Sequence, residues 1–168
     1  MTSFLDSKVA SFQCLEFVEG LGHLKESEMQ SALKKFHRAC YASTCDDFYY
    51  NKYVSYLGLT RVLTGDTSGV EQCREAANQE TLDGDIFLNL AYAELHMNSR
   101  QRSIDVLEKG LQIDDKHPGL NKLRKQLGTR QFTAFEFIPR NSLLNVALGR
   151  LTRRKIQQAQ VLEFAELM

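Results

Sequence analysis

Apolar residues recur along this chain at steps of three and four positions, which is the spacing of one face of an α-helix. The run "DIFLNLAYAELHM" (residues 85–97), for example, places Phe87, Leu90, Ala91 and Leu95 at such steps. The runs "KVASFQCLEFVEGLGHL" and "FYYNKYVSYLGLTRVL" have the same property. The spacing predicts a helix at each of these three places.

A second pattern follows each of these runs: a small residue, a bulky apolar residue four positions later, and another small residue three positions after that. Small residues at such positions let two helices approach closely, and the bulky residue fills the gap between them. The first and second copies are offset by 37 positions, and the second and third by 34 positions. We therefore predict a unit of helix, short polar turn and helix, repeated three times. The three copies are Ala32–Phe36–Ala39, Gly69–Cys73–Ala76 and Ser103–Leu107–Gly110.

Two further segments follow the third unit. The run "GLNKLRKQLG" (residues 119–128) has a leucine stripe on one face and predicts a helix that caps the last repeat. The tail from residue 129 to residue 168 is predicted to be extended up to Pro139, which ends any helix there. An amphipathic helix is expected after it, with a basic end that suits the negative end of the helix dipole. The tail residues that define these two halves are Phe132, Phe135, Phe137, Ile138, Leu144, Leu148, Arg150, Arg153 and Arg154.

Charge is unevenly spread along the chain, although the formal net charge is zero. Residues 1–118 hold 12 Lys/Arg against 18 Asp/Glu, whereas residues 119–155 hold 9 against 1. Residues 156–168 hold two acidic residues and no basic one. This asymmetry indicates either an anionic partner or a tail that folds back on its own acidic body.

The overall composition is that of a globular chain, with 43% hydrophobic and 25% charged residues in a length of 168. It predicts one domain with an appendage. We expect no signal peptide and no membrane span, and a cytoplasmic location. The four cysteines are then expected to be thiols.

Motifs for catalysis and metal binding are missing from the sequence. The stretch "GDTSG" lacks the lysine that follows in a phosphate-binding loop, and the four histidines are isolated from one another. The Cys40–Cys45 spacing matches no zinc pattern. Asp46–Asp47 and Asp114–Asp115 are interpreted as helix caps and solvated turns. We therefore expect no enzymatic activity, no cofactor and no metal.

The repeated unit resembles the tetratricopeptide repeat family over about residues 10–118. Leu57–Gly58 and Leu90–Ala91 match the pair that the family carries in its first helix, and Ala32–Phe36–Ala39 matches its second helix. The stretch "LEKGLQIDDKHP", which ends at Pro118, is similar to the family's usual repeat ending.

The chain also departs from the family's pattern. No repeat has the early tryptophan, and Thr44, Thr81 and Asp115 replace the closing proline. Repeat 2 fits its two halves only with a one-residue slip. The resemblance implies an all-α, right-handed α-α superhelix. The repeat domain is predicted over residues 1–128, with repeats at about 10–45, 47–81 and 84–118 and the capping helix at 119–128. The tail at 129–168 is an extension of this domain.

In the family, the first helices of the repeats line a groove that binds an extended peptide or a helix of a partner. The resemblance carries these groove positions over without ambiguity only in repeat 3. Ordinary helix packing is the alternative interpretation for the apolar members. The implied groove residues are Phe17, Leu21 and Leu24 in repeat 1, Asn51 and Arg61 in repeat 2, and Asp85, Leu88, Tyr92 and His96 in repeat 3.

The main functional prediction is a non-catalytic adaptor that binds a protein or peptide. One alternative is a tail that occupies its own groove or that of a neighbour, which would give an autoinhibited chain or a homo-oligomer. A second is a tail that is simply packed against the end of the stack. Contact with a membrane is expected to be at most peripheral, through residues 143–151. Binding to nucleic acid is not favoured, because the phenylalanines and arginines of the tail lie in different halves.

Overall fold

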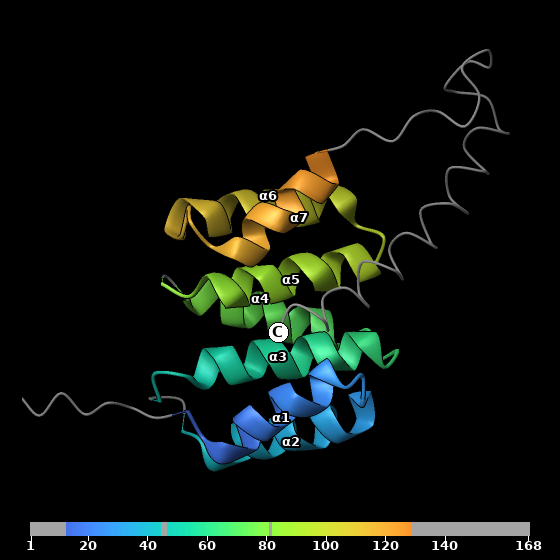
Figure 1. Cartoon of the computed structure of the whole chain (residues 1–168), viewed down its shortest axis with the longest axis vertical. Helices are drawn as coiled ribbons and strands as arrows, with labels where there is room; N and C mark the ends of the chain where they lie inside the picture. Colours follow the sequence, from blue (N-terminus) through green and yellow to red (C-terminus); the bar gives the residue numbers. More distant parts are fainter. Residues whose placement is uncertain (1–12, 45–46, 81, 129–168) are drawn as a thin grey trace, which may run out of the picture.

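The computed structural model describes residues 13–44, 47–80 and 82–128, and these form α-helices without any strand (Figure 1). The predicted all-α class is therefore confirmed for this part of the chain. None of the helices described is long and apolar enough to cross a membrane. Their bounds are α1 Leu15–Lys25, α2 Met29–Ala42, α3 Tyr50–Leu63, α4 Gly69–Gln79, α5 Gly84–His96, α6 Arg100–Ile113 and α7 Pro118–Gly128.

The helices form pairs that lie one above another in a stack (Figure 1). α1 packs on α2, α3 on α4 and α5 on α6, and α7 lies against α5 and α6 at the end of the stack. α3 also contacts α2 and α5, so that it connects the first pair to the third. α3, α5 and α7 begin at Tyr50, Gly84 and Pro118, so the interval between successive starts is constant. The architecture is therefore repeat-like within the described residues.

The short turn inside each pair contains one residue with a positive φ angle. These residues are Ser27 (61°), Gly65 (99°) and Asn98 (60°), each just beyond the end of a helix. A left-handed residue at this place lets the chain leave the helix and satisfy its last carbonyls. In the middle turn, Asp66 Oδ1 accepts hydrogen bonds from the backbone N–H and the hydroxyl of Ser68, at 3.0 and 2.6 Å. The polar residues of this turn thus stabilise the start of α4.

Small residues set the distance between α3 and α4. A Cβ atom added to Gly58 would lie 2.6 Å from the carbonyl oxygen of Gly69, and one added to Gly69 would lie 2.2 Å from the carbonyl oxygen of Gly58. The two backbones therefore touch at this crossing, where any side chain on either glycine would be too large. Cys73 lies beside it, buried, and its thiol donates to the carbonyl of Ser55 at 3.3 Å.

Four aromatic rings join the first helix pair to the second. Phe17 of α1 lies 5.6 Å from Phe36, 4.7 Å from Tyr53 and 5.2 Å from Tyr56, measured between ring centroids. The Tyr53 hydroxyl accepts a hydrogen bond from the backbone N–H of Cys14 at 2.9 Å. Phe36 is the bulky residue between Ala32 and Ala39, so the repeated pattern of the sequence supplies one wall of this cluster.

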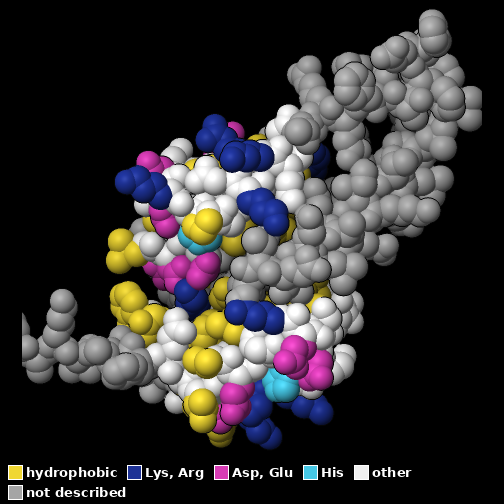
Figure 2. Space-filling model, viewed as in Figure 1, with side chains coloured by type: hydrophobic (Ala, Val, Ile, Leu, Met, Phe, Trp, Pro, Cys, Tyr) yellow, Lys and Arg dark blue, Asp and Glu magenta, His cyan; other side chains and the backbone are white. Residues whose placement is uncertain are grey.

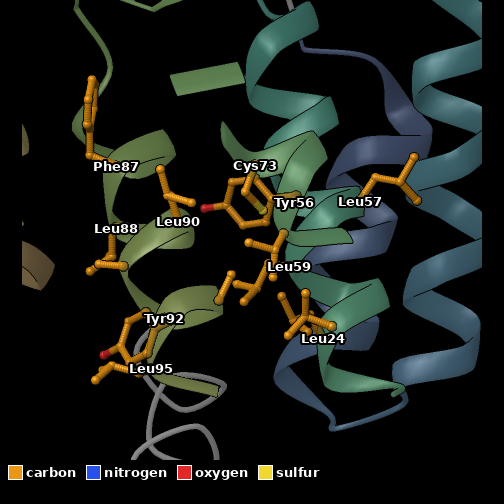
Figure 3. Packing of buried hydrophobic residues seen from close by; sticks show 14 of the residues in the cluster. Leu24, Tyr56, Leu57, Leu59, Cys73, Phe87, Leu88, Leu90, Tyr92 and Leu95 are labelled. Atoms are coloured by element: carbon orange, nitrogen blue, oxygen red, sulfur yellow. The ribbon is translucent and has the colours of Figure 1, made fainter. Parts of the chain in front are cut away.

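The core continues from this aromatic cluster through α3 and α5 to α7. Figure 3 shows its central part, where side chains of α3, α4 and α5 meet. One polar contact lies inside it: Asn89 Nδ2 of α5 donates to Ser55 Oγ of α3 at 3.0 Å, and both residues are buried. The interval between these two residues equals the interval between the starts of α3 and α5, so equivalent places in successive repeats contact each other directly.

Candidate functional site

Charged side chains link the starts of α3, α5 and α7, along the edge of the stack at the left of Figure 1. Lys52 Nζ lies 2.6 Å from Asp85 Oδ2 and 3.1 Å from Asp83 Oδ2. His117 Nε2 lies 3.0 Å from Asp85 Oδ1. We call these four residues the polar network. It ties three helices from different repeats together by their first turns.

The contacts within the polar network determine which nitrogen of His117 carries the proton, and they keep Lys52 and Asp85 charged. His117 Nδ1 accepts from the backbone N–H of Leu120 at 3.2 Å, so in the neutral ring Nε2 carries the proton and donates to Asp85. Burial disfavours the charged form of Asp85, but the hydrogen bond and charge of Lys52, and then those of His117, lower its pKa overall. Burial likewise acts against charged Lys52, and its two aspartate partners raise its pKa overall. The network therefore holds fixed opposite charges at neutral pH.

A second ion pair crosses from α4 to α5. Arg74 Nε and Nη2 lie 2.9 and 2.6 Å from Glu94 Oε1, and the Glu94 side chain is only 2% exposed. Glu71 also contacts Arg74, at 3.0 Å. The other carboxylate oxygen of Glu94 is buried and has no hydrogen-bond partner among the described residues. Because the Glu94 side chain is buried between helices, we interpret the pair as structural.

A cleft lies between α2 and α3, on the side of α3 that faces away from α5. It holds about 340 Å³ and is lined by Leu33, Lys34, His37, Arg38, Leu57 and Arg61. In Figure 3, Leu57 points away from the labelled side chains of α5. Two leucines, three cations and a histidine thus line the cleft, in a part of the chain where acidic residues outnumber basic ones. We call this place the basic cleft.

Two large apolar side chains project from the edge that also carries the polar network. Phe48 is 69% exposed and Leu82 is 72% exposed, and each lies two positions before the start of its helix, α3 or α5. Because they precede the two helices by the same distance, they are equivalent in successive repeats. Figure 2 shows hydrophobic and acidic side chains together on this edge of the stack, at the left of the view. We call the two residues the apolar edge pair.

Sequence reasoning misses the apolar edge pair, although a signal is present. The pattern places Phe48 in the run that forms α3, and it does not single out Leu82. When the chain is aligned on the constant interval between the starts of α3, α5 and α7, Phe48 and Leu82 fall at the same position, in the loops before α3 and α5. The equivalent position before α7 is Lys116, so the apolar feature occurs at two successive loops and not at the third.

Of the nine residues predicted to line a groove, four are buried and five are partly exposed. Phe17, Leu24, Leu88 and Tyr92 are buried in the core, with Phe17 in the aromatic cluster. The others are partly exposed, and Asp85 belongs to the polar network while Arg61 lines the basic cleft. His96 is half-buried, and burial lowers its pKa. The partly exposed members are Leu21, Asn51, Arg61, Asp85 and His96.

The predicted tail residues, from Phe132 to Arg154, lie outside the described residues. Cys45 lies outside them as well. The other three cysteines are free thiols, and burial raises the pKa of Cys40 and of Cys73 to about 12. Such thiols are protonated at neutral pH and are poor nucleophiles.

One group of side chains in the described part has the composition of a metal site. Ligand atoms of His23, in the last turn of α1, and of Glu26 and Glu28, in the turn that follows, lie within 4.8 Å of one another. Both glutamates are exposed, and His23 Nδ1 already lies 2.8 Å from Glu28 Oε2. We interpret the group as a hydrogen-bonded turn.

The chain matches no protein-family model, no curated protein and no solved structure. Three features of the described surface are therefore the basis for assigning a function: the polar network, the apolar edge pair and the basic cleft. Two of them lie on the same edge, where the starts of α3 and α5 meet.

Proposed function

We propose that this chain is a tetratricopeptide-type repeat protein that binds a protein or peptide and catalyses no reaction. The repeat-like stack supports this, with helix starts at a constant interval and close backbone contact inside a pair. A right-handed superhelix is part of the proposal, and so is a cytoplasmic location, which suits the free thiols.

The observation that carries the proposal is the exposure of the apolar edge pair. A phenylalanine and a leucine that are 69% and 72% exposed keep large apolar surfaces in water, at equivalent positions of two repeats. Exposed apolar surface rimmed by polar groups is typical of protein interaction sites. Here the rim is the polar network, whose Lys52 and Asp83 lie within a few residues of Phe48 and Leu82.

The proposed binding mode follows from this arrangement. Phe48 and Leu82 bury their side chains against apolar groups of the partner, and aromatic anchors of this kind contribute much of the energy in protein interfaces. The charged rim contributes orientation and specificity more than affinity. Partly exposed groove residues beside the edge, such as Asn51, then contact the flanking residues of the partner.

The test compares three forms of the full chain: the wild type, F48S/L82S, and the matched control V18S/M97S. Val18 and Met97 are also exposed apolar residues, 50% and 37%, but lie elsewhere on the stack. We expect the wild type and the control to capture the same defined partner. The purified partner should bind F48S/L82S at least about tenfold more weakly in calorimetry, since loss of two anchors removes roughly 1.4 kcal/mol or more.

Equal affinity of the partner for F48S/L82S and for the wild type would contradict the proposed site. Equal loss in the V18S/M97S control would show that binding depends on apolar surface in general. Circular dichroism melting curves of all three forms establish that each is folded.

A further inference from the structure

The basic cleft has unpaired positive charge. Within the described part of the chain, Lys34 and Arg38 form no ion pair, and Arg61 Nε reaches Asp66 only at 4.0 Å. Lys34 and Arg38 differ in this from Lys35, Lys52 and Arg74, which pair with Glu19, Asp85 and Glu94. The volume of about 340 Å³ falls within the range of roughly 300–1,000 Å³ for ligand sites. The cleft therefore suits an anionic group that carries apolar side chains.

A short sequence near the end of the chain has this chemistry. Residues 160–166 read "QVLEFAE", and residues 13–19 at the start of α1 read "QCLEFVE". Five of the seven positions are identical. The first copy binds α2 through one aromatic and one acidic side chain: Phe17 packs on Phe36, and Glu19 pairs with Lys35. The second copy has the same two groups, in Phe164 and Glu166.

The second copy cannot replace the first on its own face of α2. Gly20 follows the first copy, and a Cβ atom at Gly20 would lie 2.6 Å from Phe36 Cε1. Leu167 follows the second copy. A leucine in that place would require Phe36 to move out of the aromatic cluster. The basic cleft lies on another face of α2 and offers Lys34 and Arg38 where the first face offers Lys35.

We propose that the basic cleft binds residues 160–167 of this protein. Glu163 and Glu166 face the three cations, and Phe164 and Leu167 cover Leu33 and Leu57. The stretch from position 129 to position 159 could extend over roughly 100 Å, so the segment reaches the cleft of its own chain or that of a second copy. This site is separate from the apolar edge pair, and it adds intramolecular or self-association control to the proposed binding function.

The experiment uses the full chain with Glu163→Lys and Glu166→Lys, so that its own segment cannot compete. A fluorescent peptide of residues 156–168 is titrated into it, and binding is measured by fluorescence polarisation. We expect saturable binding that weakens roughly tenfold when Lys34→Gln and Arg38→Gln are added, since two charge pairs are lost. The wild-type chain should bind the peptide more weakly, because its cleft is occupied.

The matched control adds Arg102→Gln and Lys109→Gln instead, which neutralise two exposed cations of α6. Unchanged binding there supports the cleft, and an equal loss overturns it in favour of general charge attraction. Equal binding of a scrambled peptide overturns the choice of segment, and so does equal peptide affinity of the wild-type and E163K/E166K chains.

A monomeric wild type in sedimentation assigns the segment to its own chain, and a dimer that the E163K/E166K changes dissociate assigns it to a second copy. Melting curves establish folding, and none of these outcomes depends on the partner of the apolar edge pair.

Discussion

Glu94 is a charged residue whose side chain is 2% exposed, and one of its oxygen atoms has no hydrogen-bond partner in the part of the chain that the structure describes. Its other oxygen accepts two hydrogen bonds from Arg74. Removing a carboxylate from water is costly, and the attraction to a well-placed guanidinium offsets that cost only while both groups are present. The stability of the α4–α5 contact therefore depends on the pair being intact.

Replacing Arg74 by alanine should destabilise the fold by about 2–4 kcal/mol, because it leaves the Glu94 charge buried and unpaired. The double variant R74M/E94L should lose much less, since it removes both charges and keeps the volume. Urea denaturation followed by circular dichroism measures both free energies of unfolding. A matched change at an exposed arginine, Arg102→Ala, should stay within about 0.5 kcal/mol of the wild type. Equal losses in the single and double variants would contradict this account.

At the scale of helices, the crossing of α3 and α4 is the tightest contact described for the stack. Gly58 and Gly69 place their backbones against each other, and Cys73 fills the adjacent space. The same pattern of small and bulky residues recurs in α2 and α6, where it provides the buried faces. Helix pairs in this protein thus depend on small residues at a few fixed positions.

Gly58→Ala should destabilise the fold by about 2–3 kcal/mol, because the new methyl group would lie 2.6 Å from a backbone oxygen. Gly22→Ala in α1 provides the matched control, since among the described residues nothing beyond the local backbone of α1 lies within 4 Å of its added Cβ. That change should stabilise the helix by up to about 1 kcal/mol. Thermal unfolding of both variants measures the difference. A stabilised Gly58→Ala would show that the two helices can move apart without loss.

The helices could be predicted from the sequence because their signal is local. Apolar steps of three and four, and the triplets around Phe36, Cys73 and Leu107, depend only on residues within one helix. The one-residue slip assigned to repeat 2 concerns the place of its motif pair within the helix. Leu57 lies seven positions after the start of α3, whereas Leu90 lies six positions after the start of α5. The sequence spacing shows only that the motif pair is displaced by one residue. It does not show whether the pair has moved within the helix or the whole helix has moved with it.

At the scale of the whole molecule, the polar network joins α3, α5 and α7 through residues that are 32 and 33 positions apart. The sequence shows each of these charges, and Asp85 is among the predicted groove residues. It cannot show that they meet, because this depends on how each helix is rotated about its axis. The basic cleft is missed for the same reason: its cations come from two helices, and only Arg61 is predicted as a site residue.

The polar network should make stability depend on acid pH. The pKa of Asp85 is below its usual value of 3.8 in the folded chain, so its ionisation favours the folded state. That contribution is present above pH 3.8 and is lost as the pH falls through the lowered pKa. Asp85→Asn should therefore cost about 1–3 kcal/mol at pH 7 and progressively less toward pH 2.

Chemical denaturation of the wild type and Asp85→Asn at a series of pH values measures this difference. Glu108→Gln, at an exposed carboxylate of α6, is the control and should give a small difference that does not change with pH. A constant difference between Asp85→Asn and the wild type across the range would show that Asp85 acts through shape and not through charge.

The aromatic cluster also gives the protein an optical reporter of its own. The chain has no tryptophan, and five of its six tyrosines lie between residues 41 and 56. Tyr53 and Tyr56 are buried where the first helix pair meets the second, and the Tyr53 hydroxyl is held by the backbone of Cys14. Intrinsic ultraviolet emission therefore comes mainly from α2, α3 and the loop between them. Its changes would register separation of the first helix pair while circular dichroism still registered the helices themselves.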